Sequence, residues 1–240
     1  MPAPRFFCAI PLQANTTIEL PAATSHHALR ALRLADGDPV ILFDGRGGQY
    51  PATLSGSGTA LLARIGPHEA TDCELRGHVR LIQGIAAGDK MDWVIEKAVE
   101  LGVSEVHPVA ADRSVLKLAG PRLDKRLEHW RAIVRAASEQ CGRNRLMVVH
   151  APVTLAASLA ALSGPALFCH PDGAQPLAPA LQRVQDKVTF VIGPEGGWSE
   201  GELTQARRQS LQAVQFGPRV LRTETAGLAI VAAAVALLDW

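Results

Sequence analysis

The residues best placed to do chemistry lie in two segments near the end of the chain. The first, GPEGGWSEGE at residues 193–202, directly follows the apolar and β-branched run VTFVI. Its glycines would let backbone groups approach a ligand, and ligands of open α/β sheets bind beyond the carboxyl ends of the strands. Ser199 and Glu202 have the spacing of a capping box, which begins a helix. The segment predicts either a cofactor-binding loop or an ordinary tight turn between a strand and a helix.

The second segment, RTET at residues 222–225, stands directly before a very apolar stretch. Thr223 or Thr225 could cap a helix there, and Glu224 could be a first-turn acid that complements the helix dipole. These roles leave unexplained why an arginine and a glutamate flank the cap of so apolar a helix. The alternative interpretation is that Arg222 and Glu224 face a polar ligand.

Both segments need elements that hold them in place, and the chain divides into two parts with different patterns. Over roughly the first seventy residues, short apolar stretches alternate with turn signals, which is typical of a small barrel or sandwich. From His78 onward, apolar strand-like stretches alternate with long helical patterns, which is typical of α/β units around a mainly parallel sheet. We therefore predict an α/β protein with domains at residues 1–72 and 73–240.

The predicted elements follow from hydrophobic periodicity and turn signals. Strands are expected in the first part at 39–43, 50–54 and 60–65, and in the second at 79–85, 103–109, 146–150, 166–169, 188–192 and 213–216. The clearest helices are expected at 91–101, 122–141 and 225–238, of which Gly102 and Gly142 end the first two. Trp93 and Trp130 lie on these two helices and are predicted to pack in the core.

Composition bears on several classes of protein. Lys and Arg number 24 against 23 Asp and Glu, so a net charge of +1 means that any basic surface must be local. Four scattered cysteines without a CxxC pair indicate a reducing compartment, and His26 and His27 lack a spaced partner, so we expect no metal site. GxGxxG and GxxxxGK are absent, which disfavours Rossmann and P-loop sites. The start of the chain lacks the long apolar stretch of a signal peptide, and the longest apolar run, 228–238, is too short to cross a bilayer; we expect a cytosolic protein.

Seven ordered motifs together resemble the RsmE family of SPOUT methyltransferases over essentially the whole chain. They are HHALRALRLADGD, FDGRGGQY, GDKMDWVIEKAVELGVSEVHP, DRSVLK, RAASEQCGR, IGPEGGWSEGE and GPRVLRTETA. Two positions depart from the pattern, because Cys141 stands where a small hydroxyl residue is expected and Phe216 where an aliphatic residue is usual. Neither departure removes a polar group that we consider essential.

The resemblance implies an N-terminal PUA-like β-barrel and a C-terminal SPOUT domain with a deep trefoil knot, an exception to the unknotted topology of most proteins. It implies methylation of N3 of a specific uridine in 16S small-subunit ribosomal RNA, within the assembled small subunit, with S-adenosylmethionine as cofactor and without a metal. The cofactor-binding residues that it implies are Leu167, His170, Ile192, Gly193, Pro194, Glu195, Gly196, Gly197, Phe216, Gly217, Leu221, Arg222, Thr223, Thr225 and Ala226.

Catalysis of this reaction requires both positioning and loss of the uridine imide proton. Orientation can contribute roughly 7–11 kcal/mol, and each unit of pKa is worth about 1.36 kcal/mol, so orientation should dominate. Our hypothesis makes Glu224 the base or proton acceptor, with Arg222 holding the uracil or its phosphate. The alternative for Glu224 is a carboxylate that only stabilises a helix N-terminus.

Candidate RNA contacts come from a local basic run. Residues 113–145 contain nine Lys and Arg against Asp124, Glu128 and Glu139. This run is either a phosphate-binding surface or a solvated helix face, and the resemblance favours the former. PUA-like modules bind structured RNA by its shape and backbone, which adds barrel arginines, Arg46 among them. The predicted RNA-binding residues are Arg5, Arg30, Arg33, Arg113, Arg135 and Arg143.

Residues 225–238 read TAGLAIVAAAVALL, apolar on all sides, so something must cover the outer face of this helix. We predict a homodimer in which Ala229, Ala232, Ala233, Ala234 and Ala236 let two helices approach closely. The alternative is burial within one subunit.

Two other functions stay open: a SPOUT methyltransferase that acts on tRNA or a ribose hydroxyl, and a catalytically silent RNA-binding protein.

Overall fold

The computed structural model describes residues 3–56, 60–114, 120–173 and 175–240, which form two compact units. The first unit comprises the chain up to Glu74 together with Ser138–Leu146. The second comprises Leu75–Ala137 and Met147–Trp240. Segment 138–146, which the sequence pattern placed in the second domain, thus belongs to the first unit. Lys117 of the basic run lies outside the described residues.

A five-stranded sheet with the order β1-β3-β4-β5-β2 forms the first unit. Its strands are β1 (Arg5–Phe7), β2 (Thr17–Glu19), β3 (Pro39–Phe43), β4 (Tyr50–Ser55) and β5 (Leu62–Ile65). The three predicted strands of this part are confirmed to within two residues. β1 and β2 escaped prediction because three residues are too short to show an alternating pattern. Helix α1 (Ala22–His26) continues into a π-helical turn, η1 (His27–Ala31).

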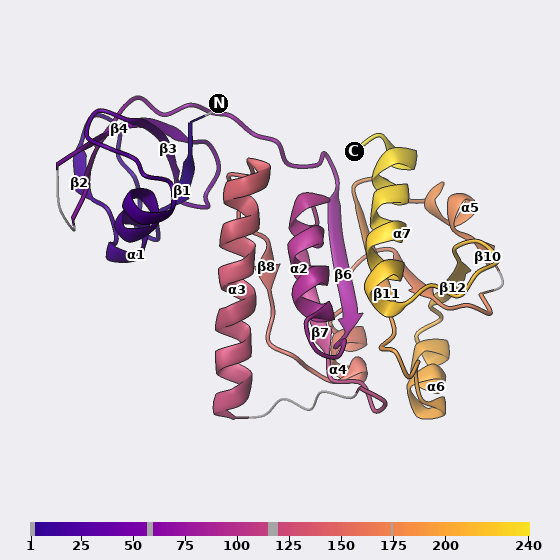
Figure 1. Cartoon of the computed structure of the whole chain (residues 1–240). Coiled ribbons are helices and arrows are strands. Elements are labelled where there is room, and N and C mark those ends of the chain that lie inside the picture. The colour runs from indigo at the N-terminus through magenta and orange to yellow at the C-terminus, as the bar shows by residue number, and fades with distance from the viewer. Residues whose placement is uncertain (1–2, 57–59, 115–119, 174) are drawn as a thin grey trace. The chain divides into compact units, whose positions relative to one another are not determined.

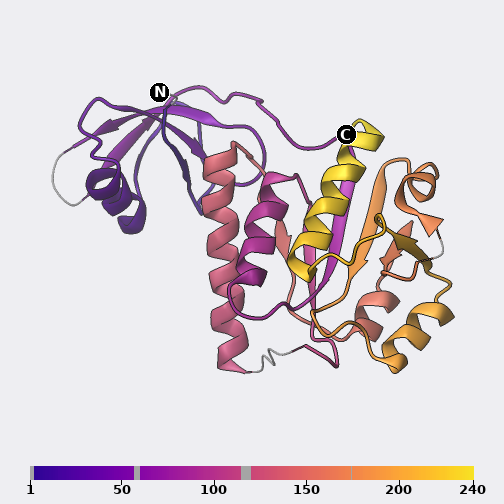
Figure 2. The ribbon, with the colours of Figure 1, turned by 45° about the vertical axis from the view of Figure 1, so that its right-hand side comes forward.

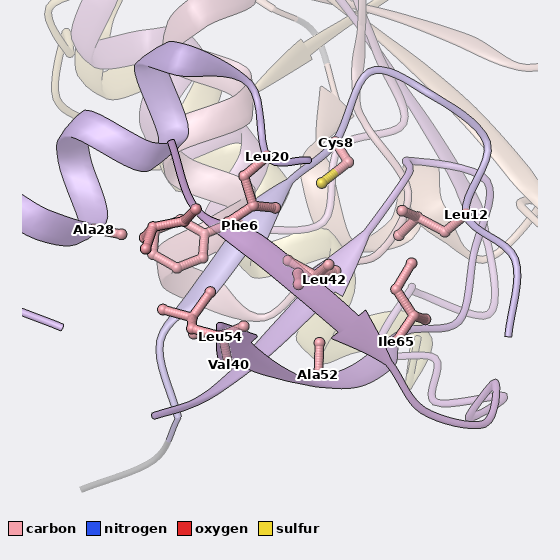
Figure 3. Close-up of a cluster of buried hydrophobic side chains, with 12 residues drawn as sticks. Phe6, Cys8, Leu12, Leu20, Ala28, Val40, Leu42, Ala52, Leu54 and Ile65 are labelled. Carbon is pink, nitrogen blue, oxygen red and sulfur yellow. The ribbon is translucent and has the colours of Figure 1, made fainter. Parts of the chain in front are cut away.

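The core of the first unit lies between the sheet and the α1–η1 segment (Figure 3). Phe6, Leu42 and Leu54 are almost fully buried and come from three neighbouring strands, while Ala28 reaches them from η1. Arg5 is held inside this unit, because it donates hydrogen bonds to Gln49 and Asn144 and lies 5.2 Å from the centre of the Phe43 ring. Burial lowers the pKa of Arg5.

A seven-stranded parallel sheet with the order β10-β12-β9-β11-β6-β7-β8 forms the second unit, as the alternating pattern predicts. Its strands are β6 (His78–Gly84), β7 (Glu105–Val109), β8 (Val148–Val149), β9 (Ala166–Cys169), β10 (Gln175–Pro176), β11 (Lys187–Ile192) and β12 (Gln212–Gln215). All six predicted strands are present, although β8 keeps only two of its five predicted residues.

Helices cover both faces of this sheet. They are α2 (Lys90–Glu100), α3 (Pro121–Cys141), α4 (Leu155–Ala160), α5 (Leu177–Leu181), α6 (Glu200–Arg208) and α7 (Thr223–Leu238). Figures 1 and 2 show α7 along β6 with α2 beside it. On the opposite face, α4 and α6 pack over Ile82, Phe168 and Val191. Among the described residues, no helix combines the length and hydropathy that crossing a bilayer requires.

Two side-chain predictions on α2 and α3 have different outcomes. Trp130 is fully buried as predicted, and its Nε1 donates a hydrogen bond to Asp92 of α2 at 3.0 Å. The prediction for Trp93 is wrong, because 53% of Trp93 is exposed and its ring lies 4.9 Å from Lys97 Nζ. The buried stripe of α2 follows Met91, Val94, Ile95, Ala98 and Val99, and Trp93 lies outside that stripe.

A polar cluster lies toward the amino end of β7, on the face of the sheet that carries Ile82. Glu105 of β7 accepts hydrogen bonds from His107, Arg80 and His150. Burial alone would raise the pKa of Glu105, but these three hydrogen bonds lower it to about 2. Glu105 is therefore ionised at neutral pH.

Candidate cofactor pocket and active site

A pocket of about 510 Å³ lies in the second unit, at the carboxyl ends of β9, β11 and β12. This is the edge of a parallel sheet where ligands are expected. Most of the predicted cofactor residues line it, namely His170, Ile192, Gly193, Pro194, Glu195, Gly197, Phe216, Gly217, Leu221, Arg222, Thr223 and Ala226. Leu167, Gly196 and Thr225 do not line it; Leu167 is buried in β9, and Thr225 is exposed.

The loop after β11 is held in place at its carboxyl end, where helix α6 begins. The predicted capping box is present, since Glu202 N donates to Ser199 Oγ and Ser199 N donates to Glu202 Oε2. Glu202 Oε1 also accepts from Asp112 N at 3.1 Å, and Ser199 Oγ donates to Asp112 Oδ2 at 2.6 Å. The loop is therefore fixed to the segment that follows β7.

Three glycines in or beside this loop are required, each for a different reason. A Cβ on Gly84, at the end of β6, would lie 2.5 Å from the Pro194 nitrogen. A Cβ on Gly196 would lie 3.0 Å from the Arg113 carbonyl oxygen, so this glycine serves packing outside the pocket. Gly197 lines the pocket and has a φ of +68°, a conformation that strains other residues.

A chain of hydrogen bonds joins β6, α7 and the loop after β11. The buried Gln83 donates from Nε2 to Thr223 Oγ1 at 2.9 Å, and Thr223 Oγ1 donates to the Gly193 carbonyl at 2.5 Å. The N-cap of α7 is Arg222, whose side chain makes no capping hydrogen bond, so the prediction of a threonine N-cap is wrong. Thr223 instead uses its hydroxyl to hold the pocket loop.

We expect Thr223→Val to lower the free energy of unfolding by about 1–3 kcal/mol, because the Gly193 carbonyl would lose its partner in a buried site. Thr223→Ser keeps the hydroxyl and should behave like the native protein. Urea unfolding measures both, with equal m-values as the sign that only stability changed. A native free energy of unfolding in Thr223→Val, with a loss only in Thr223→Ser, would show that the methyl group, and not the hydroxyl, matters.

Three charged residues meet at one side of the pocket. Lys90 Nζ lies 3.2 Å from Glu195 Oε1 and 3.8 Å from Glu224 Oε2. Burial alone would raise the pKa of Glu195, but hydrogen bonds from the Ala87 amide, its own amide and Lys90 lower it. Glu224 does not line the pocket; its Oε2 is buried and accepts no hydrogen bond from the described residues. Lys90 does line the pocket. Glu224 therefore lies beside Lys90, at the edge of the pocket.

Sequence reasoning missed several lining residues, above all Lys90 and Trp198. Lys90 carried a signal, because a lysine in the first turn of a helix opposes the helix dipole and suggests another role. Trp198 is buried, and its Nε1 has no hydrogen-bond partner among the described residues. Arg219 and Val220 also line the pocket and are exposed.

The structure separates the predicted RNA-binding arginines into two groups. Arg143 is 4% exposed and forms a bidentate ion pair with Glu74, whose nearest N–O distance is 2.5 Å. Arg5 is likewise engaged inside the first unit, so neither residue suits a phosphate contact. Arg30, Arg33 and Arg113 are exposed, and Arg135 is partly exposed. These four stay candidates.

Comparison with known proteins identifies the family. Residues 73–235 match the family described as RNA methyltransferase domain, and residues 20–65 match the one described as RNA methyltransferase PUA domain. The chain belongs to this RNA methyltransferase family. Within it, ribosomal RNA small subunit methyltransferase E of Synechocystis sp. is 33% identical over 94% of this chain and 75% of that protein. The protein of the same name from Bacillus subtilis is 30% identical over 90% and 89% of the two chains.

Solved structures support the same family. Ribosomal RNA small subunit methyltransferase E from Neisseria gonorrhoeae, bound to S-adenosyl methionine, shares 35% identity, covers 98% of both chains and has a TM-score of 0.88. A Legionella pneumophila protein in complex with the cofactor SAM shares 27% identity over 98% of both chains, with a TM-score of 0.91. The predicted class, a SPOUT methyltransferase domain with a PUA-like domain, is confirmed, and the trefoil knot stays a prediction.

Proposed function

We propose that this protein is an S-adenosylmethionine-dependent methyltransferase that acts in the cytoplasm on N3 of one uridine in 16S ribosomal RNA. The observation that carries the proposal is the pocket at the carboxyl ends of β9, β11 and β12, lined by the residues of the family motifs. The relatives named ribosomal RNA small subunit methyltransferase E supply the class of RNA.

The pocket suits this cofactor in size and in chemistry. Its volume of about 510 Å³ lies inside the range of about 300–1,000 Å³ that is usual for small-molecule sites. Gly193 and Gly197 line the pocket, and Trp198 Nε1, which has no hydrogen-bond partner among the described residues, offers a donor. Apolar walls and backbone carbonyls suit a sulfonium cation. Arg219 and Arg222 are exposed, so a phosphate or carboxylate can reach them.

When bound, S-adenosylmethionine supplies an activated methyl group. The residues of this chain must position the uracil and remove the proton from its N3. Glu224 accepts this proton, and the Lys90 ammonium stabilises the negative charge that then develops on the uracil oxygens. Arg222 holds the uracil or its phosphate. The glycine loop and the hydrogen-bond chain through Thr223 keep these groups in a fixed arrangement, which provides the larger share of the rate enhancement.

Mass-spectrometric mapping of ribosomal RNA from cells with and without the gene tests the proposed reaction. We expect a single N3-methyluridine in 16S RNA that disappears with the gene and returns with the purified protein acting on small-subunit particles. A lost modification in tRNA or on a ribose hydroxyl would assign a different substrate. A protein without measurable affinity for S-adenosylmethionine at millimolar concentration would instead be a silent RNA-binding module.

For the RNA, we propose that the exposed side of α3 contacts phosphates. Among the described residues, Arg122, Lys125 and Arg135 form no ion pair with a carboxylate, whereas Arg131 pairs with Glu128 and Arg126 with Asp92. Charges that are not neutralised within the protein are free to displace counterions from RNA.

Lys125→Ala with Arg135→Ala should therefore weaken binding to small-subunit particles and reduce the slope of log K against log salt by roughly one to two. Cofactor affinity should stay unchanged, and Arg183→Ala, an exposed arginine near α5, is the control. Filter binding at several salt concentrations measures the slope. An unaltered slope would make this side of α3 an ordinary solvated surface.

We also propose a homodimer through the outer side of α7. Ala232, Ala236 and Leu237 are exposed there, and 58% of Leu237 is accessible in the single chain. Ala234 is fully buried, which corrects its predicted place in the interface, and Ala233 is half-buried. The inner side of α7 packs on α2, α5, β6 and β11. The exposed apolar stripe needs a partner, and a second α7 with small residues fits it.

Sedimentation of the native protein at micromolar concentration should give roughly twice the chain mass of 25.5 kDa. Ala232→Arg places a charge in the middle of the proposed interface and should give a monomer with little activity. Ala156→Arg, on the exposed side of α4, makes the same change elsewhere and should stay dimeric. A monomeric native protein with full activity would rule out the dimer.

A further inference from the structure

The polar cluster of Arg80, Glu105, His107 and His150 shares no residue with the lining of the cofactor pocket. Arg80 pairs in register with Glu105, and Ile82 with His107, so alternation along the strands places these side chains on one face. His150 follows β8 and joins the same group. Cofactor-pocket residues cluster at the opposite ends of the strands. Glu105 is in register with Arg80, three residues or about 10 Å along the strand before Gln83, which pairs with the pocket residue Ile192.

Three atoms of this cluster that could bind a metal ion lie close together. Nε2 of His107 and Nε2 of His150 each lie 2.8 Å from Glu105 Oε2, although Glu105 and His150 are 45 residues apart in sequence. The two imidazole rings stack with their centroids 3.8 Å apart. Arg80 Nε donates to the other carboxylate oxygen, Oε1, at 2.8 Å, which fixes the orientation of the carboxylate. Oε2 is thus directed at the two imidazoles.

We propose that Glu105, His107 and His150 form a binding site for a divalent transition-metal ion, for which Zn²⁺ is the probe. Their donor atoms all lie within 4.8 Å of one another. Zinc bonds to histidine nitrogen and carboxylate oxygen are about 2.0–2.2 Å, so tetrahedral donors stand about 3.3 Å apart. An outward shift of about 0.5 Å from hydrogen-bond distance would admit the ion.

The donor set indicates the class of ion. Two imidazoles and one carboxylate suit Zn²⁺, Ni²⁺ or Cu²⁺, whereas Mg²⁺ and Ca²⁺ prefer oxygen ligands. His78 Nε2 lies 3.7 Å from Glu105 Oε1 and is half-exposed, so it or a water can complete the coordination. Arg80 acts as an outer partner of the ligating carboxylate, an arrangement that orients metal ligands.

The site joins β7 to the segment after β8, the two-residue strand at the edge of the sheet. An ion bound there would stabilise this edge of the sheet. None of its three ligands lines the cofactor pocket, so the ion would take no direct part in methyl transfer. This site could not be predicted from the sequence, because the two histidines come together only when β7 and β8 pair in parallel.

Isothermal titration of the chelator-treated full chain with ZnCl₂ tests the proposal. Cysteines also bind zinc, so we would use a Cys73→Ser background, which removes the one exposed thiol among four free cysteines. One zinc equivalent should bind and raise the melting temperature. His107→Ala and His150→Ala should each lower zinc affinity by at least 10-fold and abolish the melting shift.

His129→Ala is the matched control, because His129 also bonds a carboxylate, that of Asp92, at 2.8 Å but belongs to no cluster of metal-ligating residues in the described part of the chain. It should bind zinc like the parent protein. Cobalt in place of zinc should give a weak visible spectrum without thiolate charge transfer. Zinc binding that survives in the double variant His107→Ala, His150→Ala, or no binding by the parent at 100-fold excess over the protein, would overturn the proposal.

Discussion

Gly84→Ala should lower the affinity for S-adenosylmethionine by about 100-fold while the protein remains folded. The added Cβ would stand 2.5 Å from the Pro194 nitrogen, 2.6 Å from Pro194 Cδ and 2.9 Å from the Gly193 carbonyl carbon. These are backbone and ring atoms, so no flexible side chain can move aside. The glycine loop must shift, and with it the backbone that lines the pocket.

Calorimetric titration with the cofactor measures the loss, and circular dichroism with thermal unfolding shows whether the variant is folded. Gly201→Ala is the matched control, because it adds the same methyl group close by, in α6, where the nearest atom is 3.7 Å away. That change should leave affinity intact and slightly stabilise the helix. Native affinity in folded Gly84→Ala would remove the loop after β11 from the site.

Glu224→Gln should lower kcat by about 10²- to 10⁴-fold with little effect on cofactor affinity. The glutamine keeps the size of the side chain but cannot accept the uridine proton. It also removes the negative charge 3.8 Å from Lys90 Nζ. If Glu224 is the base, the rate of the variant should rise with pH, because more uridine is then already ionised in solution.

The control for this experiment is Glu200→Gln. Glu200 is also a first-turn acid, in α6, and its loss tests the interaction with the helix dipole alone, which is worth about 0.3–1 kcal/mol. It should leave kcat unchanged. A reduced rate with an unaltered pH profile in Glu224→Gln would mean that Glu224 only orders Lys90, and the assignment of Glu224 as base would be wrong.

The elements that the sequence predicted well are those determined by interactions between residues close together in the chain. The strands β3, β9 and β11 alternate or run apolar between turn residues, and α2 and α3 end within two residues of Gly102 and Gly142. The capping box at Ser199 follows from neighbours three residues apart, which interact whatever the rest of the fold does. The family motifs predicted most of the pocket-lining residues for a similar reason, because these residues come from a few short segments that are contiguous in sequence.

Only tertiary structure decided the features that depend on residues far apart in sequence. Trp93 is exposed because the packing of α2 on α7 buries a different stripe, and Arg143 is buried because it meets Glu74 across the chain. Lys90 reaches the pocket only through the place of α2 beside α7, and His107 meets His150 only through strand pairing. Periodicity reports which side of an element is apolar, but pairing between elements decides which polar groups meet.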